Sequence, residues 1–128
     1  MAIRNKNYLN LHLDFSSYTD TNDHPSDIDM SYIVPKDNTW IIGEIKNKDG
    51  ELKEGQRCLL EKYVNNWKND AICLFITHDK YFQNGDRVVY VMDCQVREFY
   101  YKYEQRWRKP RQYTKVKDVM KYFKERVN

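Results

Sequence analysis

Hydrophobic and polar residues alternate along the first part of the chain in the way that strands require. Residues 8–15 carry leucine or phenylalanine at every second position, and this period of two predicts a half-buried strand. Residues 28–34 predict a second strand and residues 39–46 a third. Pro35 and Asn38, between these two, are turn residues, so the two strands are expected to form a β-hairpin.

The rest of the chain mixes helical and strand patterns. Apolar residues at helical spacing predict an amphipathic helix over 53–69, and an unbroken apolar run over 71–77 predicts a strand that is buried on both faces. Residues 87–101 predict one or two further strands. A second helical pattern predicts a helix over 114–127, with Thr114 as its N-cap. This order of elements predicts an α/β or α+β fold, with a mixed sheet flanked by helices.

The size of the chain fits one compact domain over residues 1–128. Hydrophobic residues make up 41% of it, which suffices for a core, and the net charge of +3 is a weak indication of a polyanionic partner. No apolar run reaches the roughly 18 residues of a membrane span, and the N-terminus lacks the apolar region of a signal peptide. We therefore expect a cytoplasmic protein with no membrane partner.

Three cysteines, Cys58, Cys73 and Cys94, are odd in number and widely spaced. Because no Cys-x-x-Cys pair is present, a zinc ribbon or an iron–sulfur site is not expected. We expect three reduced, buried thiols.

The third predicted strand ends in two charged residues. Glu44 and Lys46 are two positions apart and so share one face of the strand, whereas Ile41 and Ile45 point to the opposite face. The predicted hairpin can bring Asp29 beside Glu44. Two carboxylates and one ammonium would then converge at the end of a sheet.

Such a group suits metal-assisted phosphodiester hydrolysis. Mg²⁺ favours sites with one or two carboxylates, several waters and a substrate phosphate, and a nearby ammonium can stabilise the charge that develops on phosphorus. The alternative is an ordinary Glu-x-Lys pair on the solvent face of a sheet, which contributes only ~0.2–1 kcal/mol.

The residues Asp-Ile-Asp at 27–29, a turn, and Ile-Ile-Gly-Glu-Ile-Lys at 41–46 resemble the core motif of the PD-(D/E)XK nuclease superfamily. The resemblance covers residues 27–77 and implies a restriction-endonuclease-like core. It implies that Mg²⁺, with Mn²⁺ as a substitute, is bound by Asp29, Glu44 and the Ile45 carbonyl. It also implies that Lys46 is catalytic and that Gln56, at the start of the following helix, positions Lys46 or phosphate. Asp27 is an alternative to Asp29.

Stand-alone junction resolvases and VRR-NUC-type nucleases are the members that this chain resembles in size. They imply a DNA endonuclease rather than an exonuclease, acting on branched or single-stranded DNA in recombination or repair, with a homodimer as an option. The chain departs from many members because no Glu precedes Glu44 to complete the site. Asp14 or His12 could take that place, although ordinary solvated strand residues are the simpler interpretation.

A basic segment rich in aromatic residues, residues 97–113, precedes the last helix. Cations bind phosphates, and interleaved aromatic rings stack on unpaired bases; a solvated loop is the alternative. Lys48 and Lys53 would extend the same positive surface. The residues predicted to bind nucleic acid are Lys48, Lys53, Arg106, Trp107, Arg108, Lys109 and Arg111.

Two other functions stay open at this point. An inactive nucleic-acid-binding module with the same fold would bind DNA without a metal. An interaction protein in which Glu-x-Lys is incidental would show no salt-dependent binding of nucleic acid.

Overall fold

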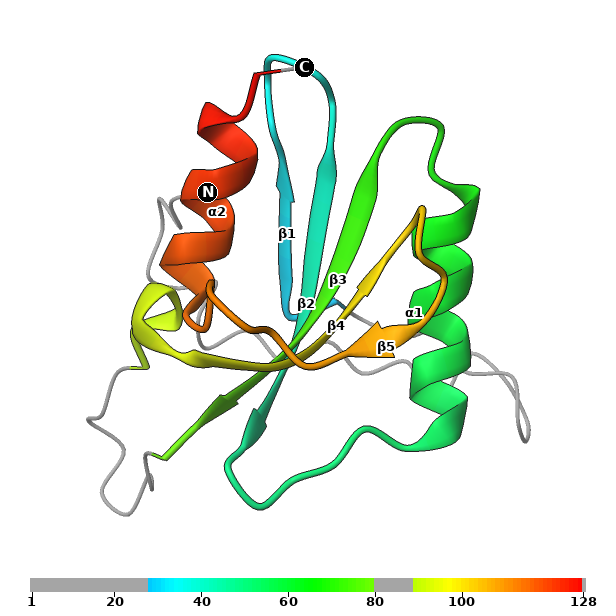
Figure 1. Ribbon diagram of the computed structural model, residues 1–128. Coiled ribbons are helices and arrows are strands. Elements are labelled where there is room, and N and C mark those ends of the chain that lie inside the picture. The colour runs from blue at the N-terminus through cyan, green and yellow to red at the C-terminus, as the bar shows by residue number, and fades with distance from the viewer. Residues whose placement is uncertain (1–27, 80–88, 128) are drawn as a thin grey trace, which may run out of the picture.

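Among the residues that the structure describes, five strands form one mixed sheet with a helix on each side (Figure 1). The computed structural model describes residues 28–79 and 89–127, so the predicted strand over 8–15 lies outside it. This architecture confirms the predicted α+β class. The elements are β1 (Met30–Ile33), β2 (Trp40–Asn47), α1 (Glu54–Asn66), β3 (Ala71–His78), the short 3₁₀ helix η2 (Val91–Asp93), β4 (Gln95–Tyr101), β5 (Trp107–Arg108) and α2 (Val116–Glu125).

The first two strands form the predicted hairpin. β1 runs antiparallel to β2, and the Val34 N–H donates to the Thr39 carbonyl over 2.9 Å to close the turn. Asn38 in this turn has a φ of 59°, a left-handed conformation that asparagine tolerates better than most residues. Both strands predicted from the alternation are therefore confirmed, with small shifts at their ends.

α1 carries the chain from β2 to a strand that runs parallel to it. Parallel neighbours need such a crossover because a tight turn cannot connect them. Trp40 is paired with Ala71 at one end of the two strands, and Asn47 with His78 at the other. The carboxyl ends of β2 and β3 therefore meet at one place, which we call the carboxyl end of the sheet.

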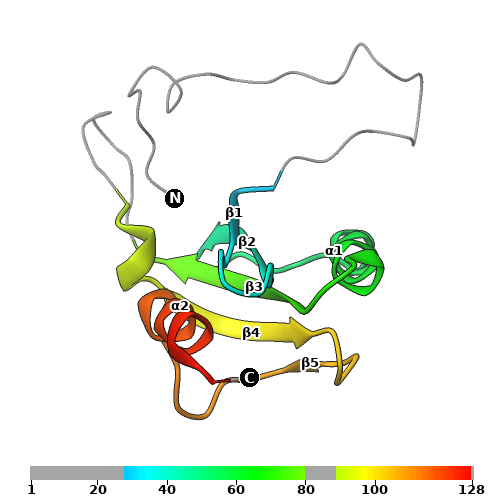
Figure 2. The ribbon, with the colours of Figure 1, turned by 90° about the horizontal axis from the view of Figure 1, so that it is seen from above.

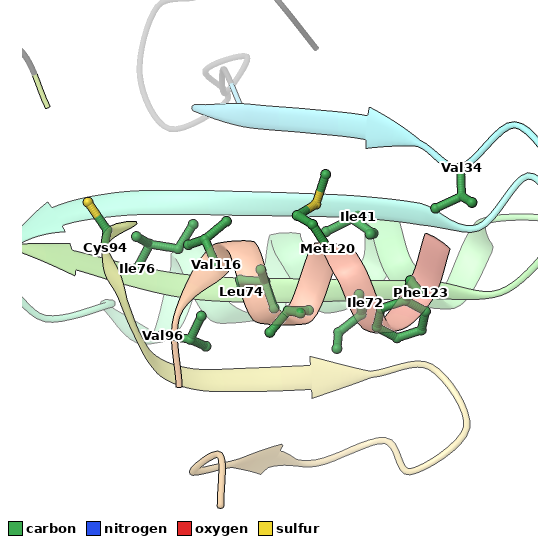
Figure 3. Packing of buried hydrophobic residues seen from close by; sticks show 11 residues of the cluster. Val34, Ile41, Ile72, Leu74, Ile76, Cys94, Val96, Val116, Met120 and Phe123 are labelled. Carbon is green, nitrogen blue, oxygen red and sulfur yellow. The ribbon is translucent and has the colours of Figure 1, made fainter. Parts of the chain in front are cut away.

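The two helices cover opposite faces of the sheet (Figure 2). Alternate residues of β3 point to α1 and to α2, so that residues 71–77 are all buried, as the unbroken apolar run predicts. The α2 face holds a core in which helix residues pack on β3 and β4 (Figure 3), namely Ile72, Leu74, Ile76, Val96, Val116, Val119, Met120 and Phe123. The α1 face holds Ile42, Leu52, Leu60, Val64, Ala71, Cys73, Phe75 and Tyr100.

Several details at the ends of the elements differ from the prediction. The N-cap of α2 is Lys115 rather than Thr114; Lys115 forms a bridge with Gln95, and the Val96 N–H donates to the Thr114 carbonyl over 2.8 Å. Val127 follows α2 and is 97% exposed, so it does not belong to the buried face of that helix. Neither α1 nor α2, the two α-helices in the described residues, is long and apolar enough to cross a bilayer.

The cysteines also differ in part from the prediction. Cys73 and Cys94 are buried as expected, but Cys58 is exposed on α1. The expectation was wrong for Cys58 because its position lies outside the apolar stripe of the helix, whose buried residues are Leu60 and Val64.

A cluster of buried polar groups ties the end of α2 to the rest of the fold. The Arg126 guanidinium, just beyond α2, donates to Asp70 over 2.6 Å, to Thr39 over 3.0 Å and to Asp37 over 3.4 Å. The Tyr101 hydroxyl donates to Asp70 over 2.7 Å. Asp37 lies in the β1–β2 turn and Asp70 directly precedes β3, so the Arg126 side chain joins three segments that are distant in sequence.

Removing Arg126 should destabilise the fold strongly. The side chains of Arg126 and Asp70 are only 17% and 12% exposed, so an Arg126→Ala substitution leaves a nearly buried carboxylate without its cation. We expect the free energy of unfolding, measured by urea denaturation, to fall by about 3 kcal/mol. The control is Lys117→Ala, because the ion pair of Lys117 with Asp93 is more than half exposed and its loss should cost less than about 1 kcal/mol. Equal losses in the two variants would contradict a structural role for the cluster.

The same cluster predicts a dependence of stability on alkaline pH. Burial, together with the hydrogen bond to Asp70 and its charge, raises the pKa of Tyr101 to about 12, although Arg126 acts in the opposite direction. Between about pH 10 and about 12 this phenol ionises in the unfolded chain but not in the folded one, so its contribution to stability is complete below pH 10 and is lost as the pH rises. We expect the free energy of unfolding to fall more steeply over this range in the wild type than in Tyr101→Phe. Tyr103 is exposed, so a Tyr103→Phe control should show the same decrease of the free energy of unfolding with pH as the wild type. If Tyr101→Phe also decreases as steeply as the wild type, Tyr101 is not the group responsible.

Candidate functional site

The strand pairing of the hairpin brings two carboxylates together. Met30, the first residue of β1, is paired with Gly43. Asp29 directly precedes Met30 and Glu44 directly follows Gly43, so both lie beside this pair at the same end of the hairpin. The Ile45 N–H also donates to Asp29 Oδ2 over 2.8 Å, which fixes the Asp29 carboxylate against the backbone between Glu44 and Lys46.

Glu44 and Lys46 project from the α1 face of the sheet, at its carboxyl end. They continue the row of Ile42, which is fully buried under α1, and both are partly buried. Their neighbours on β3 are Phe75 and Thr77. Along this face of β2, residues therefore change from buried and apolar at Ile42 to charged and partly exposed at Glu44 and Lys46.

The charge of Glu44 affects the Cys73 thiol in the core. Burial, and to a smaller extent the negative charge of Glu44, raises the pKa of the Cys73 thiol, which therefore stays protonated. Cys73 lies on the α1 face of β3, so this coupling agrees with a Glu44 side chain on that face. Ile45 packs against the core of the opposite face, so only its backbone lies beside the two carboxylates.

Gln56 lies at the same end of the sheet but already has a structural role. α1 runs back along β2, which brings its first turn to the carboxyl end. The Lys53 N–H donates to Gln56 Oε1 over 3.2 Å, as part of a capping box at the start of the helix. The predicted placement of Gln56 thus agrees with the geometry, and its side-chain oxygen is engaged by the helix cap.

Besides Lys46, three cations of the described residues lie near the carboxyl end, and sequence reasoning missed one of them. Lys48 follows β2 and Lys53 precedes α1, as predicted. Arg97, on β4, is exposed, and its guanidinium donates to the Lys48 carbonyl over 3.2 Å. A β-bulge opposite Phe75 and Ile76 leaves Arg97 out of the regular pairing, and no local pattern in the sequence indicates such a bulge.

Sequence reasoning also missed an ion pair on the α1 face. Arg57 of α1 forms an ion pair of 2.7 Å with Glu98 of β4, and its guanidinium lies 4.8 Å from the centre of the Trp107 ring. The pair joins residues 41 positions apart in sequence, so it depends on the tertiary fold. It separates the carboxyl end of the sheet from the Trp107 side chain.

A cavity of about 350 Å³ opens beside the carboxyl end. Its lining includes Lys48, His78 and Asp79, and also Thr77, which is the strand neighbour of Lys46. Asp29, Glu44 and Lys46 are not among its lining residues, and Val89 and Cys94, which are, pack with the core of the α2 face.

The basic segment that was predicted as one unit is divided between different elements. Residues 97–101 belong to β4, and β5 adds a strand that the sequence did not predict. Trp107 faces α1, where its indole N–H donates to Glu61 over 2.8 Å, so most of its ring belongs to the packing of that face. Arg108 forms an ion pair with Glu104 and lies on the α2 face, 6.0 Å from the centre of the Phe99 ring.

The remaining members of this segment lie away from the carboxylates. Arg106, Lys109 and Arg111 are exposed, and Lys109 and Arg111 border a groove beside α2. β5 is three strands away from β2, which is about 14 Å at the usual spacing of strands. The structure therefore brings Asp29, Glu44, Lys46, Lys48, Lys53 and Gln56 to one end of the sheet, but does not bring the residues from 106 to 111 there.

Comparison of the chain with known proteins identifies no relative. No family model matches the chain, and no curated protein and no solved structure matches it. Within the described ranges, no group of three or more histidine, cysteine, aspartate or glutamate side chains could hold a metal ion, and the alternatives Asp14, His12 and Asp27 lie outside those ranges.

The hydrogen bond between Asp29 and Ile45 can be tested without any assumption about function. Asp29→Ala removes the acceptor and should lower the free energy of unfolding by about 1 kcal/mol, whereas Asp29→Asn keeps an acceptor oxygen in place. Hydrogen exchange measured by NMR should show the Ile45 amide exchanging faster in Asp29→Ala than in Asp29→Asn. If the Ile45 amide is equally protected in both variants, the bond does not hold this end of the hairpin.

Proposed function

We propose that this protein is a Mg²⁺-dependent nuclease of the PD-(D/E)XK type that hydrolyses phosphodiester bonds in DNA. The observation that carries the proposal is the Asp29 carboxylate, which accepts a hydrogen bond from the N–H of Ile45, the middle residue of Glu-x-Lys. This contact supports an acidic residue beside Glu44 and Lys46, at the carboxyl end of a parallel strand pair. The β1–β2–α1–β3 arrangement agrees with a restriction-endonuclease-like core.

The donor set fits Mg²⁺. This ion keeps several waters and is typically bound by one or two carboxylates together with phosphate oxygens of the substrate, and Asp29 and Glu44 are such a pair. The Ile45 carbonyl is a third oxygen of the same strand end, and Mn²⁺ accepts the same oxygen ligands. When bound, the metal supplies a water of lowered pKa and polarises a phosphoryl oxygen.

The other residues at this end would position the substrate. The Lys46 ammonium lies on the same face as Glu44, where it can stabilise the negative charge that grows on the scissile phosphate. Lys48, Lys53 and Arg97 bind neighbouring phosphates by charge, with little preference for sequence. Gln56 uses its side-chain oxygen in the helix cap, which leaves its amide N–H groups to donate to a phosphate.

Finer features of this function rest on the resemblance alone. They are endonucleolytic cutting of branched or single-stranded DNA in recombination or repair, and a homodimer.

A cleavage assay tests the proposal directly. The purified protein is incubated with a labelled four-way junction, a duplex and a single strand, each with Mg²⁺, Mn²⁺ or EDTA. We expect cleavage in Mg²⁺ or Mn²⁺ and none in EDTA. Glu44→Ala removes a metal ligand and Lys46→Ala removes the ammonium, so each should lower the rate by at least about 100-fold, the scale of one lost electrostatic contact to a transition state.

Matched controls come from α2, on the opposite face of the sheet. Glu125→Ala and Lys121→Ala remove an exposed acid and an exposed ammonium there and should retain the wild-type rate. Binding of DNA without cleavage in any metal would instead favour an inactive binding module. Neither cleavage nor binding would make Glu-x-Lys an ordinary pair on the sheet and favour an interaction protein.

A further inference from the structure

A groove of about 490 Å³ lies on the α2 face, between α2 and the segment that follows β4. Its volume is within the range of sites that bind small organic groups. The bottom is formed by core residues of the strands and of the helix, including Ile72, Leu74, Val119 and Phe123. The groove is therefore apolar at its base and open above.

The rim of the groove is positively charged. Arg108, Lys109 and Arg111 border it, and among the residues that line it Glu104 is the acidic one and forms an ion pair with Arg108. The net charge of the rim is therefore positive even after this pair is counted. By charge complementarity the groove favours an anionic occupant.

Aromatic rings form one wall of the groove. Tyr113 and Tyr122 are each 44% exposed, and their ring centres lie 5.3 Å apart. Phe99, with the Arg108 guanidinium over its ring, also lines the groove. Exposed rings beside cations suit a ligand that is planar and negatively charged at once, which is the chemistry of a nucleotide.

We propose that this groove binds an unpaired strand of nucleic acid. A base stacks on Tyr113 and Tyr122, and the flanking phosphates contact Lys109 and Arg111. Arg108, held over Phe99 by its ion pair with Glu104, supports the strand at the β5 end of the groove. Trp107, which faces α1, takes no part in this site.

The groove and the candidate catalytic residues lie on different faces of the sheet, so the groove would bind the substrate at a place separate from the site of cleavage. The groove is on the α2 face and Glu44 is on the α1 face, so the sheet lies between them. A strand held in the groove would pass around an end or an edge of the sheet to reach Glu44. This use rests on the proposed nuclease function and identifies its substrate as DNA that carries an unpaired strand next to the cut.

Binding measured without any divalent ion tests the groove independently of cleavage. Fluorescence anisotropy in EDTA would follow the binding of labelled oligothymidylate to the wild type and to variants. Tyr113→Ala should weaken binding at least about five-fold, because one base–aromatic stack is lost. Arg111→Ala should lower the slope of log affinity against log salt by about 0.7, the value for one phosphate contact of a single strand.

Two control variants match these changes outside the groove. Tyr103→Ala removes an exposed tyrosine that does not line the groove, and Lys121→Ala removes an exposed cation of α2. Both should bind as the wild type does. The altered side chains of all four variants are exposed, so loss of folding does not explain a change.

The outcomes separate this proposal from the proposed function. The proposal that the groove binds an unpaired strand would be overturned if Tyr113→Ala and Arg111→Ala both kept the wild-type affinity and salt slope. It would also be overturned if the wild type did not bind the oligonucleotide at all. So would equal competition by thymidine monophosphate or by polyglutamate, which would indicate a mononucleotide pocket or unspecific attraction of anions. Groove-dependent binding in a protein that never cleaves DNA would support the groove and refute the nuclease.

Discussion

The burial of β3 on both faces is the constraint on which this structure depends. A strand that is covered by a helix on each side has to satisfy all its backbone groups within the sheet, which it does by pairing with β2 on one edge and β4 on the other. The parallel pairing with β2 requires a crossover, and the crossover is α1. The carboxyl ends of β2 and β3 are then left side by side without a turn to connect them, and this is where an opening in the core can be lined by charged side chains.

The two ends of the sheet are organised for different tasks. At the end where β3 begins, Arg126, Asp70, Tyr101 and Asp37 form a network of hydrogen bonds and ion pairs with little exposure of the charged side chains. At the carboxyl end, Asp29 and Glu44 lie on neighbouring segments of the hairpin, and Lys46, Lys48, Lys53 and Arg97 lie at the same end of the sheet. The Arg126 network stabilises the fold, so that the carboxyl end can carry like charges whose mutual repulsion would otherwise cost stability.

Sequence reasoning succeeded where the information is local. The strand periods, the turn at 35–38 and the helical stripe of α1 each depend on neighbours within a few positions, and the placement of Asp29 beside Glu44 follows from that one hairpin. It failed where the fold brings distant segments together. β5 has two residues, too few to show a period, so the alternation that sends Trp107 and Arg108 to opposite faces could not be read. Arg97 and the Arg57–Glu98 pair likewise depend on the pairing of β4 with β3 and on its bulge.

The uneven burial of the cysteines makes the protein convenient to label. Cys73 and Cys94 are enclosed by the two cores, and the elevated pKa of Cys73 keeps it from forming the thiolate that alkylating reagents attack. Cys58 is exposed on α1, two residues beyond Gln56. A maleimide dye would therefore attach at a single position in the native protein, one helical turn from the helix cap at the carboxyl end, and would act as an optical reporter of what approaches the paired carboxylates.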